Sequence, residues 1–385
     1  MIKNLIFLFH LYQPSTQDEN VLRLVTAQTY RPLFELLLQH PQVKVVLNIN
    51  ASLTEQWKRV GEEEVLLLLK KLLKRQQIEL TTSAKYHPLL SRLPLTEIKH
   101  QIYLNNESHY RLLDPDVKLK GFFPPELAFN SLVAQALSEL GLQWVVLEDI
   151  AFPQPSQLNF NFFYQISETS LKAFFRHKGL SLALAFGHFR KAAEFYQACK
   201  ESDDAYALIA LDGETFGHHH PEALFLLADI FALDLPWNTL TGLLEENKYP
   251  VQETTVLPST WGMMKKEGQW RIFPRWDNPH NPIHQRQWQL FYLALSLILR
   301  CQGTEEGYLE TRIIFDQAVQ SDQFFWAAGD PCWHPGMVAK GADLLLEAIR
   351  RNPVVSKEEV IRGEILRQEI REIGFKLFGN KIILA

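Results

Sequence analysis

Short apolar runs alternate with helical patterns over roughly the first 260 residues, and this alternation most limits what the chain can fold into. We interpret the runs as strands at Asn4–Phe9, Val43–Asn48, Gln77–Thr82, Lys118–Gly121, Trp144–Glu148, Leu182–Phe186 and Tyr206–Asp212. Continuous apolar runs are typical of parallel strands that are covered on both faces. Strands that alternate with helices form βα units. The sequence therefore predicts an α/β fold with a barrel of about seven units.

Helical patterns fill the segments between these runs and dominate the last part of the chain. In the first part, helices are predicted at Val21–Gln39, Glu62–Arg75 and Ser131–Leu140. After about residue 280 the predicted helices follow one another, at Pro282–Cys301, Thr304–Gln320, Pro335–Arg351 and Ser356–Phe378. We therefore expect two domains: a barrel over residues 1–280, and a C-terminal helical bundle over residues 281–385 that packs on the barrel.

Charge, cysteine content and hydropathy argue against several classes of protein. The chain carries 39 Lys and Arg against 44 Asp and Glu, a net charge of −5, which argues against nucleic acid and anionic membrane surfaces as partners. The three cysteines form no CxxC pair, so neither a disulfide framework nor a thiolate zinc site is expected. The N-terminal run MIKNLIFLFH is too short for a signal peptide, and no stretch of about 18 apolar residues suggests a membrane span. We expect a cytoplasmic protein, and the sequence leaves its oligomeric state open.

Two carboxylates follow predicted strands in settings that suit chemistry. In a βα barrel the functional groups lie at the carboxyl ends of the strands. Glu126 lies in FFPPELAFN, where two prolines stiffen the loop that holds the carboxylate. Asp212 ends the apolar run ALIAL, so partial desolvation should raise its pKa and suit a general acid. Each also has an ordinary explanation, because Glu126 could be a solvated or helix-capping residue and Asp212 could begin a turn. Glu214 is a rival to Asp212.

Histidines and tryptophans accompany these carboxylates. His10 and Gln13 follow the first predicted strand, although a lone histidine there is more often buried and bonded to the backbone. The run His218–His220, with Asp212 and His10, offers metal-ligand chemistry as an alternative. Trp261 and Trp326 fall in irregular or late segments, where tryptophan either stacks on sugar rings or fills a core. Two carboxylates with aromatic platforms around them are what glycoside hydrolysis requires.

An ordered series of five short motifs resembles glycoside hydrolase family 57 over nearly the whole chain. The motifs are HLYQP at His10–Pro14, QQIEL at Gln76–Leu80 with YHP at Tyr86–Pro88, GFFPPELAF around Glu126, LDGETFG around Asp212, and SDQFFWAAGD at Ser321–Asp330. The resemblance implies an irregular (β/α)7 barrel, an incomplete TIM-like barrel, followed by a helical region. It places the nucleophile on Glu126 and the acid/base on Asp212 of a retaining mechanism, in which the carboxyl groups lie ~5–5.5 Å apart.

The resemblance also implies a substrate and the residues that hold it. The expected substrate is an α-glucan such as starch, glycogen or a maltooligosaccharide, cleaved by water or passed to an acceptor sugar, without a metal or cofactor. His10, Gln13, Glu79, His87 and Phe123 are expected to line the donor sugar. Trp261, Asp322 and Trp326 are expected to shape the outer walls.

Three departures from the family pattern leave the sugar open. Tyr12 stands for a second histidine, Phe123 for a tryptophan and Gln76 for a glycine. The alternatives are an α-galactosidase of the same family, a metal-dependent deacetylase-like hydrolase that uses Asp212, His10 and the histidine run, and a glucan-binding protein without activity. The intact pair of Glu126 and Asp212 favours an enzyme.

Overall fold

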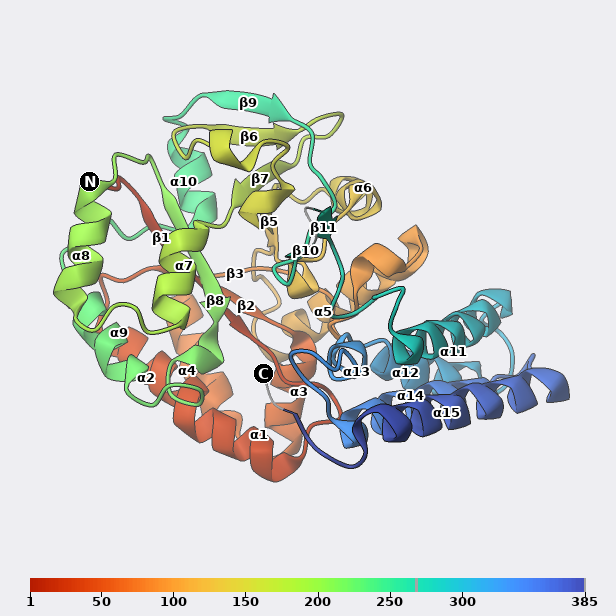
Figure 1. Ribbon diagram of the computed structural model, residues 1–385. Coiled ribbons are helices and arrows are strands. Elements are labelled where there is room, and N and C mark those ends of the chain that lie inside the picture. The colour runs from red at the N-terminus through yellow and green to blue at the C-terminus, as the bar shows by residue number, and fades with distance from the viewer. Residues whose placement is uncertain (267–268, 384–385) are drawn as a thin grey trace. The chain divides into compact units, whose positions relative to one another are not determined.

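The computed structural model describes residues 1–266 and 269–383 and contains two compact units (Figure 1). The first unit comprises Met1–Lys85 and Leu90–Ser259, and the second comprises Tyr86–Leu89 and Thr260–Ala385. The short segment Tyr86–Leu89 thus belongs with residues much later in the chain. The domain boundary at residue 280 remains a prediction.

Within the described residues, seven strands of the first unit form a ring from two sheets, which confirms the predicted barrel. They are β1 (Leu5–Leu11), β2 (Val45–Ile49), β3 (Ile78–Leu80), β4 (Gly121–Phe122), β5 (Trp144–Leu147), β7 (Lys172–Phe175) and β8 (Ala207–Asp212). Parallel ladders join β3–β2–β1–β8 and β4–β5–β7. The sheet that contains β4, β5 and β7 continues beyond β7 into β6 (Phe163–Ile166) and β9 (Val251–Thr254).

Backbone bonds close the ring at the two places where the ladders end. Between β3 and β4, the N–H of Thr82 donates to the Gly121 carbonyl at 2.9 Å, and the N–H of Phe123 donates to the Thr82 carbonyl at 3.1 Å. Between β7 and β8, the N–H of His177 donates to the Leu208 carbonyl at 2.7 Å. The carboxyl ends of all seven strands therefore meet at one end of the ring, as in other βα barrels.

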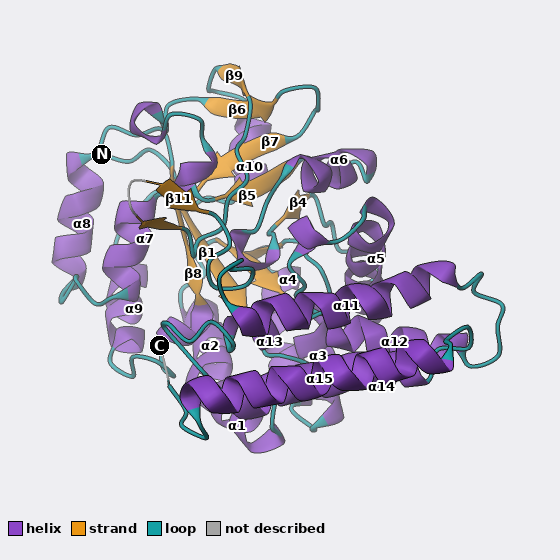
Figure 2. Cartoon of the chain, turned by 45° about the vertical axis from the view of Figure 1, so that its right-hand side comes forward, coloured by secondary structure: helices purple, strands orange, loops and turns teal. Residues whose placement is uncertain are grey.

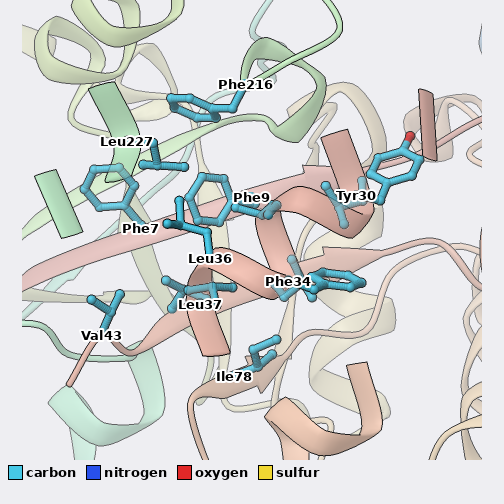
Figure 3. Packing of buried hydrophobic residues seen from close by; sticks show 14 of the residues in the cluster. Phe7, Phe9, Tyr30, Phe34, Leu36, Leu37, Val43, Ile78, Phe216 and Leu227 are labelled. Atoms are coloured by element: carbon cyan, nitrogen blue, oxygen red, sulfur yellow. The ribbon is translucent and has the colours of Figure 1, made fainter. Parts of the chain in front are cut away.

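Both faces of the strands are buried, which explains their continuous apolar runs. Phe7 and Phe9 of β1 pack among Leu36 and Leu37 of α2 and Leu227 of α9 (Figure 3). The helices of this unit are α1 (Glu19–Val25), a π-helical segment (Thr26–Tyr30), α2 (Arg31–Gln39), α3 (Ala51–Arg59), α4 (Glu63–Lys74), α5 (Leu95–Leu112), α6 (Ser131–Glu139), α7 (Lys178–Ala185), α8 (Ala192–Glu201), α9 (Ala223–Phe231) and α10 (Leu240–Glu246).

One predicted strand is wrong. Leu182–Phe186 lies mostly in α7, and the strand that occupies this place in the ring is β7, which was not predicted. The segment KGLSLALA contains Leu and Ala but no β-branched residue, so its helix propensity is high. Leu180 and Leu184 are both buried at the helical i, i+4 spacing. The side chain of His177 accepts from the Leu180 N–H and begins the helix.

The second unit is mainly helical, as predicted. It contains β10 (Met264–Lys266), β11 (Gln269–Arg271), α11 (Pro282–Arg300), α12 (Tyr308–Ala318), α13 (Asp322–Phe325), α14 (Pro335–Arg350) and α15 (Lys357–Phe378). Figure 2 shows α11, α14 and α15 running side by side. Asn281 caps α11 and Ser356 caps α15 in a capping box. No helix among the described residues is long and apolar enough to cross a bilayer.

Candidate active site

Side chains that point into the ring gather at the carboxyl end of the sheet β3–β2–β1–β8. Phe7, Phe9 and Leu11 belong to the core shared with the helices, so His10 points the opposite way, into the ring. In the ladders His10 pairs with Asn48 of β2 on one side and with Asp212 of β8 on the other. These three side chains therefore form one row at the barrel mouth, which is the end of the ring where the strands have their carboxyl ends.

His10 is held as a neutral imidazole. Burial lowers the pKa of His10 to about 4, although its bond to Asn48 opposes this change. Its Nδ1 lies 2.6 Å from Asn48 Oδ1, and Asn48 Nδ2 donates to Thr81 Oγ1 at 2.8 Å. In the neutral form Nδ1 carries the proton that is donated to Asn48, so Nε2 carries the lone pair. In this tautomer Nε2 is the hydrogen-bond acceptor of the ring.

Asp212 ends β8 at the mouth, where its side chain is half-buried. The surrounding protein raises the pKa of the Asp212 carboxyl above its ordinary value, because burial outweighs the opposing charge of Arg176. A carboxyl group with a raised pKa retains its proton closer to neutral pH, as a general acid requires. This agrees with the direction of the shift inferred from the apolar run that precedes the residue.

Glu214, the rival carboxylate, is engaged in a different set of contacts. Its Oε1 accepts from the hydroxyl of Tyr30, from Gln13 Nε2 at 3.5 Å and from the backbone N–H of Tyr12 at 3.4 Å. Burial and the charge of Asp212 raise the pKa of Glu214. These contacts join the loop after β8 to the loop after β1, so we assign Glu214 to holding the two loops together. Gln13, predicted to bind sugar, lies in the same network.

Glu126 is presented by a strained loop. Pro124 and Pro125 precede it, and its own backbone is left-handed, with φ 60° and ψ 16°, followed by Leu127 with φ 46°. Non-glycine residues in this region are uncommon and cluster at functional sites. The N–H groups of Leu127 and Ala128 donate to the carbonyls of Pro124 and Pro125 at 2.8 and 2.9 Å. The turn therefore holds the half-buried Glu126 in a defined place.

Phe123 connects the Glu126 loop to the row that contains Asp212. Its ring stacks on the imidazole of His10, with centroids 4.8 Å apart and planes 18° apart. His10 in turn is the register partner of Asp212. The loop after β4 and the end of β8 thus meet the same histidine, so Glu126 and Asp212 belong to one end of one barrel.

Glu79 lies deeper in the ring than this row. It pairs with Val46, two residues before Asn48. Its Oε2 accepts from the Thr241 N–H at 3.0 Å, at the start of α10. Burial raises the pKa of Glu79 while the bonds from Thr241 oppose the change. The contact described for this carboxylate is thus to a helix start, and its assignment to a sugar stays a prediction.

The other predicted site residues belong to the second unit. His87 has φ 54°, and its Nδ1 lies 3.0 Å from Ser321 Oγ, next to Asp322. Asp322 begins α13 and Trp326 follows its end, where the Trp326 N–H donates to the Asp322 carbonyl at 2.8 Å. The structure therefore brings His87, Asp322 and Trp326 near one another. Trp261 is half-buried in a turn of the same unit, and its role as a wall residue stays a prediction.

The histidine run makes other contacts. His218 Nδ1 lies 2.8 Å from Gln28 Oε1, and the His218 N–H donates to Thr29 Oγ1 at 3.1 Å. Among the residues that the structure describes, no three His, Cys, Asp or Glu side chains are grouped to hold a metal ion. The ligand set of the deacetylase-like alternative is therefore not assembled from these side chains.

Several residues of the mouth were not predicted. Asn48 follows the same rule as His10, since it is a polar residue near the end of an apolar run, and that rule could have found it. Arg176 follows β7, the strand that was not recognised. Tyr30 lies in a π-helical segment inside a continuous helical pattern, and no local signal distinguishes it.

Comparison with known proteins agrees with this geometry. The family model for glycosyl hydrolase family 57 matches residues 7–231, more than half of the chain. The α-amylase of Pyrococcus horikoshii and the 4-α-glucanotransferase of Thermococcus litoralis are each 26% identical over 219 residues, 56% of this chain. The matched regions cover 34% and 33% of those relatives, so the match spans about a third of their length.

Solved structures show the same fold over more of the chain. A family 57 branching enzyme from Pyrococcus horikoshii superposes with a TM-score of 0.75 at 14% identity, covering 97% of this chain and 96% of that one. The 4-α-glucanotransferase of Thermococcus litoralis gives a TM-score of 0.70 at 18% identity, covering 90% and 58%. Fold, motif order and family match agree, and the chain belongs to glycosyl hydrolase family 57.

Proposed function

We propose that the chain is a retaining glycoside hydrolase or transglycosylase that acts on α-1,4-glucans. One observation carries the proposal: the strained Glu126 loop and Asp212 meet the same histidine at the mouth of one barrel. Family membership supports the reaction class, and relatives named α-amylase and 4-α-glucanotransferase support the substrate class. The oligo- or polysaccharide is the proposed partner. A cytoplasmic location stays a prediction.

In the proposed mechanism Glu126 attacks the anomeric carbon while Asp212 gives its proton to the leaving oxygen, and a glycosyl-enzyme forms. Asp212, now ionised, takes the proton of water or of an acceptor hydroxyl, which displaces Glu126 and restores the original configuration. The raised pKa of Asp212 serves the first step, because a protonated acid is required there. Neutral His10 accepts a hydrogen bond from a sugar hydroxyl through Nε2.

The test uses variants that separate the two carboxylates. Glu126→Gly and Asp212→Ala would be incubated with α-glucosyl fluoride and azide, beside wild type on maltoheptaose, with a chelator throughout. Without the nucleophile, azide attacks the face opposite fluoride and gives the β-glycosyl azide. Without the acid/base, fluoride still leaves, and azide attacks the glycosyl-enzyme and gives the α-glycosyl azide. This opposite stereochemistry assigns each role.

Glu253→Gln is the matched control, because Glu253 is exposed on β9, and it should keep wild-type turnover. Shorter sugars alone from maltoheptaose would indicate hydrolysis, and longer sugars as well would indicate transfer. Wild type that turns over neither substrate would overturn the α-glucan proposal. Assays with α-galactosides, and with metal added on acetylated sugars, would then decide between the alternatives.

A further inference from the structure

Arg176 joins three strand ends of the barrel. Its backbone N–H donates to the Leu147 carbonyl of β5 at 2.8 Å, so it continues the β5–β7 ladder. Its Nε donates to the Ala210 carbonyl of β8 at 2.7 Å. Ala210 lies two residues before Asp212 in the same strand. The side chain therefore joins β7 to β8 two residues before the proposed acid/base.

A buried carboxylate fixes this guanidinium. Arg176 Nη1 lies 3.1 Å from Glu148 Oε2, and their side chains are 6% and 1% exposed. Lys178 Nζ lies 3.2 Å from Glu148 Oε1 and 3.7 Å from Asp149 Oδ1. Removing two charges from water can cost more than their attraction returns, so a buried ion pair is weak evidence for a stabilising role. The position of the Arg176–Glu148 pair, where β7 meets β8, indicates a role in the reaction instead.

We propose that Arg176 is a positioning residue of the reaction, which holds the end of β8 in place and sets a fixed positive charge beside Asp212. The inference rests on the proposed function, because it assigns Asp212 the acid/base role. Arg176 itself contacts Ala210 and Glu148, so it acts on the substrate through Asp212.

The positive charge of Arg176 matters because Asp212 must act first as an acid and then as a base. Burial favours the protonated form that the first step needs, and the ionised form is needed in the second step. The guanidinium of Arg176 opposes burial and holds the pKa of Asp212 lower than burial alone would. Other titratable groups at this end of the barrel include His10 of β1, which is neutral, Glu214 in the following turn, Tyr30, whose pKa burial raises, and the proposed nucleophile Glu126. Arg176 is the positive charge within this set.

The experiment measures the protonation of Asp212 with and without substrate. Arg176→Gln, Arg176→Lys and the double variant Arg176→Gln/Glu148→Gln would be compared with wild type. The double variant leaves no unpaired buried carboxylate, so it guards against misfolding. The first readout is the ¹³C titration of the Asp212 carboxyl, assigned with Asp212→Asn. The second readout is the pH profile of kcat/KM on maltoheptaose.

Loss of the charge should move the Asp212 titration, and the alkaline limb of kcat/KM, upward by roughly half a pH unit or more in Arg176→Gln. The shift should have the same direction but be smaller in the double variant, which also removes the negative charge of Glu148. Arg176→Lys should stay near the wild-type midpoint. The control Arg31→Gln breaks an ion pair with Glu62 in the same unit and should leave both readouts unchanged. A folded Gln variant with the wild-type titration midpoint would overturn the inference. Because the titration needs no substrate, an inactive wild type would instead count against the proposed function.

Discussion

The ring of Phe123 lies parallel to the imidazole of His10, with 4.8 Å between their centroids. Phe123 follows β4 and His10 belongs to β1, so this contact spans the barrel mouth between two strands that are not neighbours. Both rings are almost completely buried. The stack restrains one face of the His10 ring, while Asn48 holds its Nδ1, and it places the loop that leads to Glu126 against the row of Asp212.

Replacing Phe123 by Leu should therefore reduce catalysis as well as stability. The smaller side chain releases one face of His10, and we expect kcat/KM on maltoheptaose to fall by about tenfold, which corresponds to ~1.4 kcal/mol. The free energy of unfolding should fall by about 1–2 kcal/mol. Phe34→Leu is the control, since Phe34 is equally buried but lies in α2. Equal losses of activity in the two variants would refute a specific role for the stack.

Gln76→Gly should stabilise the chain. Gln76 is exposed two residues after the end of α4 and has φ 57°, a backbone region that favours glycine after a helix. Glycine relieves this strain, although its greater conformational freedom in the unfolded chain offsets part of the gain. The free energy of unfolding should therefore rise by about 0.5–1 kcal/mol. Gln76→Ala retains the Cβ and should bring no gain. Denaturant unfolding compares the three proteins, and equal stability of the Ala and Gly variants would contradict the explanation.

Gly121→Ala should damage the barrel next to the Glu126 loop. A Cβ atom at Gly121 would lie 2.0 Å from the Trp144 indole, which is fully buried. The indole must move, at a cost of about 1–3 kcal/mol or more in the free energy of unfolding. Gly179→Ala in α7 meets no atom closer than 3.7 Å and should be neutral or stabilising. Thermal unfolding tests the pair, and a neutral Gly121→Ala would show that the indole has room.

His109 should make the protein sensitive to acid. Burial, helped by the charge of Lys85, lowers the pKa of His109 to about 3, whereas an unfolded histidine titrates near 6.5. Between these values the unfolded chain binds a proton that the folded chain does not. The free energy of unfolding therefore falls as pH falls through this window, by up to ~1.4 kcal/mol per pH unit.

His109→Leu should remove this contribution. Within residues 1–266 and 269–383, neither ring nitrogen of His109 finds a hydrogen-bond partner, so leucine breaks no bond. Urea unfolding at several pH values between 4.5 and 7 would show a shallower loss of stability at low pH than in wild type. His188→Gln, at an exposed position, should leave the slope as it is. An unchanged slope in His109→Leu would rule out His109 as the source.

Much of the first unit was predictable because its strands are buried on both faces. A strand such as β1 is apolar at every position before His10, so both its extent and the polar residue at its end are visible in the sequence. The helix starts at Asn130, Asn281 and Ser356 were also predictable, because their side chains cap the backbone locally. These signals depend on near neighbours in the chain.

What could not be predicted depends on distant partners. β7 reads KAFF, four residues that are indistinguishable from many loop segments, and it is a strand because β5 and β6 pair with it. Missing β7 also hid Arg176. In the same way, the contact between Glu79 and Thr241 joins residues 162 positions apart. A sequence motif indicates that a residue such as Glu79 lies near a site, but it does not predict which group forms a hydrogen bond with the carboxylate.

The strands of the barrel are joined unequally around the ring. Six residue pairs align β1 with β8, whereas β7 meets β8 through the His177–Leu208 bond and the Arg176 side chain. Local fluctuations that expose the interior to solvent should therefore begin at this seam, where fewer bonds must break, and amide hydrogens there should exchange first. A ligand bound across the mouth would restrain the same seam. Ligand binding and the free energy of local opening are then thermodynamically linked. A bound sugar chain would raise the free energy that is needed to separate β7 from β8.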